Sequence, residues 1–553
     1  MDFEPILPAA RGAAMRAAGL WPDRLIIDHL DEAAARDPQR IAIVDHNTMT
    51  GLRTELTYGE LAARSIRIAA GLAALGVEHG DVVAVQLPGW WHYAALHCAC
   101  VRIGAAVNPL MPIFRERELE FMLGFAASRV VIVPRSFRGF DYPAMLAGLR
   151  DQLPALEHVL VVGGEDRHTA FESVLLEHPH ETETDVGALF AARRPSPDDV
   201  TEIMYTSGTT GRPKGVMHTS NTLLCKAQLA TELFDYRAGD AVFMGSPVAH
   251  QTGFMYGIVF AIANHAKCVL LDQWDPQRAA RIIAETRCTV TLGATPFLAD
   301  LIDVARQDAE SLAHLRLFLC AGAPIPRVMV HDAARLLPNL YVMSAWGMTE
   351  MGISTATYPG DSADKVFETD GRALPGHAVR IVDDHGEPLP PDTEGRLQAR
   401  CASLFVGYLK RPEAYEVDDE GWFETGDNAR MDADGYIRIT GRSKDIIIRG
   451  GENIPVVEVE ELLYRHPAVI DAAVVAMPDA RLGERACAFV TLHDGGTLDL
   501  AGLGAWLVEQ RLTRQYLPER LEIIEAFPRT PSGKIQKFVL REQARALTAA
   551  RPA

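Results

Sequence analysis

The chain has little that would suit it to nucleic acid or to a membrane. Its 54 Lys and Arg residues are outnumbered by 73 Asp and Glu residues, which gives a formal net charge of −19. A field of that sign repels anionic polymers, so we expect no nucleic-acid partner and expect anionic ligands to be held by local geometry. An uncharged stretch at 241–266 is long enough to span a bilayer, but it contains Ser, Pro, His, Gln and Asn. We therefore expect no membrane insertion.

Cysteine pairs with a characteristic spacing are also lacking. The eight cysteines are scattered, and only Cys98 and Cys100 are close, at a spacing typical of neither zinc nor redox sites. We expect reduced thiols that lie mostly in the core, as in a cytoplasmic protein. The first residues lack the continuous apolar stretch of a signal peptide, and the final RPA is not a peroxisomal address, which favours the same location.

What is present is typical of a folded α/β protein. The chain has 553 residues, 48% of them hydrophobic and 23% charged, which indicates two to four domains. Runs rich in β-branched residues, such as 82–89 and 130–134, alternate with helical patterns and predict largely buried sheets. One helix is clearly delimited, because Thr57 and Glu60 form a capping-box pattern and Gly76 provides a stop.

The pattern changes towards the C-terminus. Past residue 380 the strands are shorter, and turn residues at 384–386 and 390–395 predict a small β-rich subdomain. Charges and glycines then crowd beside a short apolar strand, where we place the domain boundary. We predict a large N-terminal domain at 1–440 and a small α+β C-terminal domain at 441–553.

The stretch YTSGTTGRPKG at 205–215 is suited to a phosphate group. Its three glycines let the backbone expose N–H groups, and its Ser and Thr hydroxyls and Lys214 add donors and a positive charge. It is not the Gly-Lys-Ser/Thr phosphate loop, because Pro213 stands five residues after Gly208. A solvated surface loop is the alternative, but strand-like runs on both sides favour the ligand role.

Three further stretches are too polar to be explained by folding alone. They are SAWGMTEMG at 344–352, GWFETGDNARMDADGYIRITGRSKD at 421–445, and PRTPSGKIQK at 528–537. In this order and spacing, the four motifs resemble the acyl-adenylate-forming superfamily, which includes acyl-CoA synthetases, amino-acid adenylation domains and firefly luciferase. The resemblance implies an α/β fold with stacked αβ subdomains and a β-rich subdomain in the large domain. The small C-terminal domain would be mobile, with the active site between the two domains.

The resemblance also implies a reaction in two steps. A carboxylate attacks the α-phosphorus of ATP and expels pyrophosphate, and a thiol, usually that of coenzyme A, then displaces AMP. The second nucleophile arrives with the substrate, so no protein Ser or Cys nucleophile is needed. We therefore expect ATP, Mg²⁺, coenzyme A and a small carboxylic acid as ligands.

Most of the nucleotide site is implied residue by residue. The family positions that hold the β- and γ-phosphates are matched by Thr206, Ser207, Gly208, Thr209, Thr210 and Lys214. Those beside the adenine are matched by Gly322, Ala323, Trp346, where the family usually has Tyr, and Gly347. The run LCAGAPIP that holds Gly322 could instead simply end a buried strand.

Catalysis is assigned by the same resemblance. Thr349 would contact the α-phosphate and Glu350 would ligate Mg²⁺, although this pair alone could equally be a helix N-cap. Lys534 would bridge the carboxylate and the α-phosphate. The motif around Lys534 also resembles a site of lysine acetyltransferases, so acetylation would neutralise its charge.

The remaining nucleotide and hinge positions follow the third motif. Asp427 would accept the ribose hydroxyls and Arg442 would meet a phosphate or the ribose, although either could be a surface ion pair. Lys444 falls at the hinge of the family. The thiol tunnel would be lined by Gly450, Gly451 and Glu452, for which an exposed turn is the alternative.

The acid itself is less well defined. The residues expected beside it are His250, Gly253, Ala321 and Met348. No Asp stands between 247 and 254 to hold an amine, which favours an acid without an amino group. The sequences of several motifs also resemble those of short- and medium-chain and alicyclic acyl-CoA synthetases. A stand-alone adenylation enzyme that loads a carrier protein and a catalytically silent nucleotide-binding scaffold are the alternatives.

Overall fold

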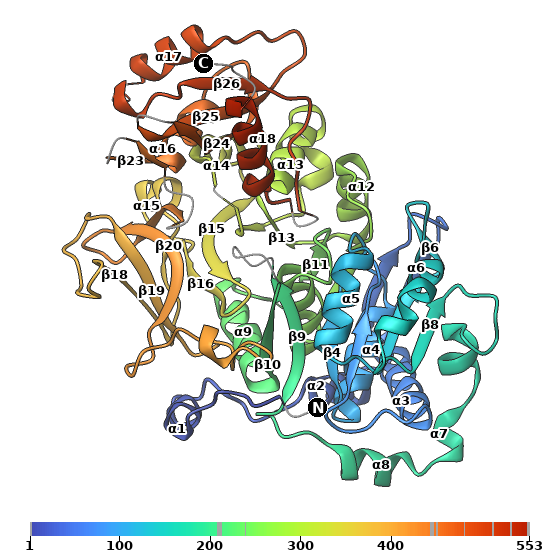
Figure 1. Cartoon of the computed structure of the whole chain (residues 1–553). Helices are drawn as coiled ribbons and strands as arrows, with labels where there is room; N and C mark the ends of the chain where they lie inside the picture. Colours follow the sequence, from blue (N-terminus) through green and yellow to red (C-terminus); the bar gives the residue numbers. More distant parts are fainter. Residues whose placement is uncertain are drawn as a thin grey trace.

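A computed structural model describes most of the chain. The described residues are 3–206, 213–237, 239–323, 325–442, 447–449, 452–479, 482–510, 512, 514–530 and 533–549. Two large sheets with flanking helices share the first part of the chain, and a β-rich subdomain and a C-terminal α+β unit follow them (Figure 1). The predicted α/β fold class is therefore confirmed, with a large N-terminal and a small C-terminal domain.

The first large sheet is built from buried, mostly parallel strands. Its spatial order is β10-β9-β4-β3-β5-β8, and only β10 runs antiparallel to its neighbour. The strands are β3 (Val82–Val85), β4 (Ala106–Pro109), β5 (Val130–Pro134), β8 (His158–Val162), β9 (Val200–Thr206) and β10 (Lys214–Thr219). Its helices are α3 (Tyr58–Ala74), α4 (His92–Arg102), α5 (Glu116–Phe125), α6 (Tyr142–Leu149) and α9 (Ser220–Leu233). The strands β9 and β10 flank the phosphate motif, as predicted.

The clearest sequence-level helix is confirmed at both ends. Thr57 Oγ1 accepts from the Glu60 backbone N–H at 3.2 Å, and Glu60 Oε2 accepts from the Thr57 N–H at 2.8 Å. Gly76 follows the helix with φ of +86°, a conformation that a glycine adopts without strain. The capping box and the glycine stop therefore set the limits of α3.

Several of the predicted site residues lie at or near the ends of strands of the second large sheet. Its order is β17-β16-β15-β14-β13-β11-β12-β1-β2. The strands are β1 (Ile41–His46), β2 (Arg53–Thr57), β11 (Ala241–Met244), β12 (Lys267–Leu271), β13 (Val290–Gly293), β14 (Leu317–Cys320), β15 (Tyr341–Met348), β16 (Gly352–Ala356) and β17 (Arg372–Ala373). Its helices include α10 (Gln251–Gly253), α12 (Pro276–Thr286), α13 (Thr295–Asp308) and α14 (Arg327–Leu336).

The β-rich subdomain and the C-terminal unit complete the chain. Antiparallel strands form the first: β18 (His377–Val382), β19 (Gly395–Cys401), β20 (Phe423–Met431) and β21 (Ile437–Arg442). The second contains β22 (Ile447–Arg449), β23 (Glu452–Ile454), β24 (Val469–Asp479), β25 (Gly483–Leu492), β26 (Arg520–Ile523), α16 (Val456–Tyr464), α17 (Leu500–Glu509) and α18 (Lys537–Ala549). The C-terminal unit has a hydrophobic core of its own. The boundary at 440/441 falls near the end of β21 and stays a prediction.

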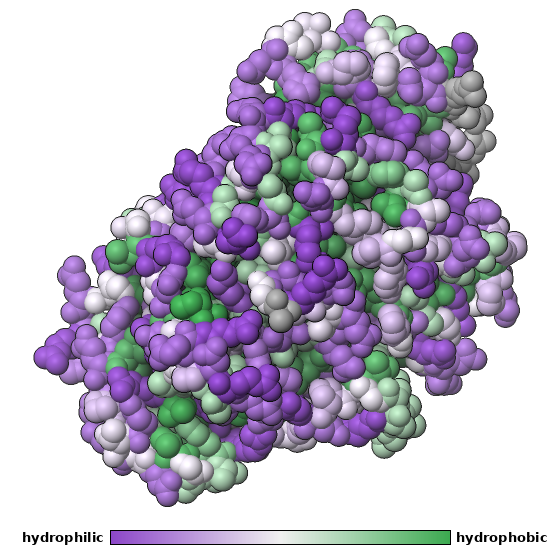
Figure 2. All heavy atoms as spheres, turned by 180° about the vertical axis from the view of Figure 1, so that it is seen from behind, coloured by the Kyte–Doolittle hydropathy of each residue, from purple (hydrophilic) through white to green (hydrophobic). Residues whose placement is uncertain are grey.

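The hydropathy of the surface and the burial of the thiols match what the composition predicts. In Figure 2, hydrophilic residues dominate the visible face and hydrophobic residues form scattered groups among them. Among the described residues, no helix is both long and apolar enough to cross a membrane. All eight cysteines are free and buried, and burial raises the pKa of Cys98 to about 12, so the expectation of thiols in the core is confirmed.

Candidate active site

Lys534 reaches from the C-terminal domain to the end of a strand in the N-terminal domain. Its backbone is held in a tight turn, in which Lys534 N donates to Thr530 Oγ1 at 3.0 Å and Thr530 N donates to Lys534 O at 2.8 Å. Gly533 lies against the start of α13, where an added Cβ would be 3.4 Å from Pro296 Cγ. A Cβ added to Gly322 would lie 3.4 Å from Lys534 Cε, so this side chain covers the glycine that follows β14. Gly322 has φ of +87° and lies two residues beyond the end of the buried strand β14.

His250 lies close to the same lysine. It is the N-cap of α10, and its Nδ1 accepts from the Thr252 backbone N–H at 3.3 Å, so Nε2 is the protonated ring nitrogen of the neutral side chain. Burial, and then the ammonium of Lys534, lower the pKa of His250 to about 3. The histidine therefore stays neutral at physiological pH beside a lysine.

Glu350 and Lys214 meet at a tyrosine that sequence reasoning missed. Tyr408 donates its hydroxyl to Glu350 Oε1 at 2.7 Å, and Lys214 Nζ lies 4.5 Å from the centre of the Tyr408 ring. Tyr408 is brought there because residues 406–409 pair with β10, with Leu409 N donating to Gly215 O at 2.8 Å. Burial and the Glu350 charge raise the pKa of Tyr408 well above its usual range, so it remains a donor. The only hint of this arrangement in the sequence is the glycine before Tyr408. In the structure, Gly407 has φ of +116°.

Thr349 and Glu350 form a turn between β15 and β16, so the alternative of a helix N-cap is excluded. The Thr349 carbonyl lies 2.8 Å from His218 Nε2. A carbonyl oxygen can only accept, so Nε2 carries the proton that holds this turn.

A buried amine lies beneath the same turn. Lys226 Nζ is 2.9 Å from His218 Nε2. Burial lowers the pKa of Lys226 to about 7, and burial raises the pKa of Glu202, whose charge interacts with it, to about 8. A partly neutral lysine can accept from the same Nε2–H. No local pattern predicts this group, because α9 and β9 contain several polar residues and the burial of Lys226 and Glu202 depends on how these elements pack.

Trp346 contacts a carboxylate rather than open solvent. Its Nε1 donates to Asp427 Oδ2 at 2.8 Å, and the indole is only 7% exposed. Asp427 in turn lies directly opposite Arg442 in the antiparallel pair of β20 and β21. The predicted adenine and ribose positions are therefore joined by one hydrogen bond. Stacking of Trp346 on a purine stays a prediction.

Two predicted small residues have a packing reason for being glycine. A Cβ on Gly253 would lie 2.3 Å from Pro247 O, and one on Gly347 would lie 2.2 Å from Gly352 O. Both glycines therefore permit a close approach of backbone segments. Ala321, Ala323 and Met348 are half-buried. The contacts of these residues with an acid stay predictions.

Part of the predicted site lies outside the described residues. These are Ser207, Gly208, Thr209, Thr210, Lys444, Gly450 and Gly451. For Arg442 and Glu452 only the strand position is described. In the described part, Lys214 begins β10, Thr349 and Glu350 follow β15, and the Lys534 side chain lies over Gly322, beyond the end of β14.

Comparisons with known proteins agree with this geometry. The sequence matches the AMP-binding enzyme family over residues 30–409 and the AMP-binding enzyme C-terminal domain over residues 458–534. It is 37% identical over 535 residues to the medium-chain fatty-acid–CoA ligase of Escherichia coli K12, over 96% of this chain and 92% of that protein. It is 31% identical to a salicylyl-CoA synthase / salicylate adenylyltransferase from a Streptomyces species, over 99% of this chain and 98% of that protein.

A solved structure gives the same result. The ATP-bound MatB of Rhodopseudomonas palustris matches with a TM-score of 0.81 and 27% identity, over 94% of this chain and 99% of that one. The chain therefore belongs to the AMP-binding, acyl-adenylate-forming enzyme family, and it is an ATP-using, AMP-forming acid–thiol ligase of the acyl-CoA synthetase type.

Proposed function

We propose that the enzyme joins a small or medium aliphatic or alicyclic carboxylic acid to coenzyme A through an acyl-adenylate. The observation that carries the proposal is the placement of Lys534, which extends from the C-terminal domain over Gly322. A cation at this position would offset negative charge as the carboxylate approaches the α-phosphate. Because His250 is neutral, it would not compete with Lys534 for the acid.

The nucleotide would be held by groups that are fixed before it binds. Lys214 would contact the outer phosphates with Thr206, and Asp427 would accept the ribose hydroxyls. Glu350 would hold Mg²⁺, and the site fits that ion, since a buried carboxylate oxygen is the kind of ligand Mg²⁺ prefers. Mg²⁺ would supply charge neutralisation for the phosphates. The contact from His218 would keep Thr349 aimed at the α-phosphate.

The class of acid follows from the relatives and from the residues near the acyl position. The medium-chain fatty-acid–CoA ligase among the relatives favours an aliphatic acid, and the absence of Asp at 247–254 disfavours an amine-bearing one. The salicylyl-CoA synthase / salicylate adenylyltransferase among the relatives supports an aromatic acid as the second candidate.

The test is product analysis after incubation with ATP, Mg²⁺, coenzyme A and a panel of acids: acetate to decanoate, cyclohexanecarboxylate, benzoate and salicylate. We expect acyl-CoA and AMP from an aliphatic or alicyclic acid. Acyl-AMP without thioester would instead indicate a carrier protein as the acceptor, and a preference for salicylate would contradict the proposed acid class. We also propose that acetylation of Lys534 would block acyl-adenylate formation and spare the transfer to the thiol. Assays of both steps with protein acetylated at this lysine would test this.

Replacing Trp346 by Phe should raise the KM for ATP about tenfold. The change removes one hydrogen bond to a carboxylate, a contribution of about 1.5 kcal/mol, and leaves Asp427 without its buried donor. Steady-state kinetics at saturating acid would measure the change. Trp506→Phe is the control, because it removes an indole hydrogen bond to Leu462 O within the C-terminal domain. An equal effect of both variants would contradict the assignment of Asp427 to the ribose.

Glu461→Gln should slow adenylation about 3- to 10-fold without slowing thioester formation from acyl-AMP. Glu461 of α16 pairs with Arg438 of β21 and lies 3.9 Å from Arg327 Nε, so it joins the C-terminal domain to the large domain in the arrangement that delivers Lys534. The Glu461 side chain is 12% exposed, so the pair is worth more than a surface pair of about 0.5 kcal/mol. Separate assays of the two half-reactions would show the difference. Glu458→Gln, on an exposed position of the same helix, should change neither rate.

A further inference from the structure

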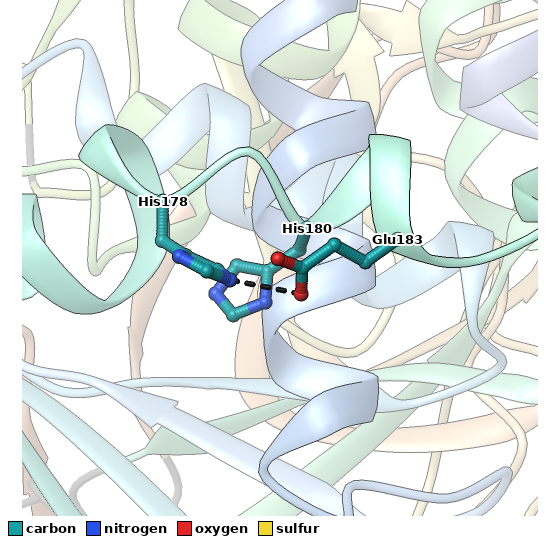
Figure 3. A group of neighbouring side chains, drawn as sticks. All are labelled: His178, His180 and Glu183. Atoms are coloured by element: carbon teal, nitrogen blue, oxygen red, sulfur yellow. Dashed lines mark hydrogen bonds and ion pairs between the residues drawn. The ribbon is translucent and has the colours of Figure 1, made fainter.

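A cluster of two histidines and one glutamate lies outside the active-site motifs. His178, His180 and Glu183 belong to the segment between β8 and β9, around η2 (Ser173–Glu177) and α7 (His180–Glu183). Their ligand atoms all lie within 4.8 Å of one another. Figure 3 shows the three side chains turned toward a common point. No described catalytic residue contacts them.

The distances suit a small coordination shell. His178 Nε2 lies 3.0 Å from Glu183 Oε2. Two ligand atoms on a tetrahedral Zn²⁺ ion stand about 3.3 Å apart, given metal–ligand distances of about 2.0–2.1 Å. The His178 and Glu183 side chains are 45% and 59% exposed, so an ion can reach them from solvent and small rotations can adjust them.

His180 is oriented as a metal-binding histidine is. Its Nε2 lies 2.7 Å from Val174 O, and since a carbonyl only accepts, Nε2 carries the proton and Nδ1 keeps its lone pair. Histidine ligands of metals characteristically donate the other ring N–H to such an oxygen, which fixes the tautomer. The ring is also packed against α3, because a Cβ on Gly71 would lie 2.9 Å from His180 Cδ2. One ligand is therefore preorganised.

The surrounding charges hold the segment in place without occupying the cluster. Arg67 of α3 binds Glu181 at 2.6 Å and donates to Leu176 O at 2.8 Å. Ser173 donates to Glu177 at 3.2 Å. Arg67 is therefore paired with Glu181, and Glu183 pairs with His178. Three ligands within six residues also need little loop closure, with Pro179 stiffening the chain between the histidines.

We propose that His178, His180 and Glu183 bind one divalent transition-metal ion of the Zn²⁺ class, apart from the active site, and thereby fasten this segment to α3. Imidazole nitrogen and carboxylate oxygen suit Zn²⁺, and Ni²⁺ and Cu²⁺ would bind the same donors. Mg²⁺ needs a shell of oxygen ligands, so it would not compete. The site is independent of the proposed acid and acceptor.

The test is a Zn²⁺ titration of the full-length enzyme without a polyhistidine tag, by competition with a chromophoric chelator in excess Mg²⁺. We expect one site that His178→Ala and Glu183→Gln each weaken at least tenfold, and a Zn²⁺-dependent rise in Tm that both variants lose. His168→Ala, an exposed histidine ten residues before His178, is the control and should bind normally. Thermal unfolding in chelator would show that all variants fold. Equal affinity of wild type and His178→Ala, or equal weakening by His168→Ala, would overturn the proposal and leave only a His–Glu ion pair.

Discussion

Replacing Lys534 by Ala should lower the rate of acyl-adenylate formation about 10²–10³-fold. That range is typical for the loss of one preorganised donor to developing charge. The effect should fall on the first half-reaction alone, because we expect rotation of the C-terminal domain to withdraw this lysine before the thiol step. The rate of thioester formation from chemically prepared acyl-AMP and coenzyme A should change less than about twofold, a separation that a general folding defect would not produce.

Pyrophosphate release with the preferred acid would measure the first step, and thioester absorbance the second. Lys534→Arg keeps the charge and should retain more activity than Lys534→Ala, but less than wild type, since the guanidinium is bulkier over Gly322. Lys365→Ala is the control, because that lysine pairs with Asp432 and Asp434 in the β-rich subdomain region. A parallel fall in both half-reactions would mean that Lys534 serves stability or the whole site.

Arg327→Met should destabilise the large domain by about 3–5 kcal/mol. Arg327 donates to Asp370 Oδ1 at 2.8 Å and to Thr369 O at 3.0 Å, and the two charged side chains are 3% and 8% exposed. Removing one partner of a buried pair leaves the other charge unpaired in a poorly solvated site. Asp370 Oδ2 also accepts from the Ile439 N–H at 2.8 Å, so the loss should reach the junction of α14 with β21.

Urea unfolding followed by far-UV circular dichroism would measure the change as a lower midpoint. The double variant Arg327→Met/Asp370→Asn removes both charges and should recover part of the loss, because the two residues form one unit. Arg335→Met, at the exposed end of α14, should leave the midpoint unchanged. If Arg327→Met were as stable as wild type, the pair would contribute no net stability.

The sequence predicted those parts of the structure that carry a local signal. The capping box of Thr57 and Glu60 and the stop at Gly76 act within one helix, so their pattern is complete in the chain. The turn signals at 384–386 and 390–395 likewise lie between β18 and β19. The four motifs identified the family, because their residue types and spacing are rarely combined by folding alone.

The missed contacts are long-range ones. Tyr408 meets Glu350 across 58 positions, and Trp346 meets Asp427 across 81. Neither pairing follows from a local period, since it depends on which strands lie side by side. The buried Lys226 beside His218 was missed for a related reason, because α9 contains several polar residues and its sequence does not show which of them is buried.

The most direct test of the account follows an oxygen atom. With the preferred acid carrying ¹⁸O at both carboxylate oxygens, attack on the α-phosphorus places one labelled oxygen between the acyl group and AMP, and the thiol then leaves it on AMP. We predict one ¹⁸O per AMP, with acyl-CoA and AMP formed in equal amounts. Label in inorganic phosphate with release of ADP, or unlabelled AMP, would contradict an acyl-adenylate formed beside Lys534.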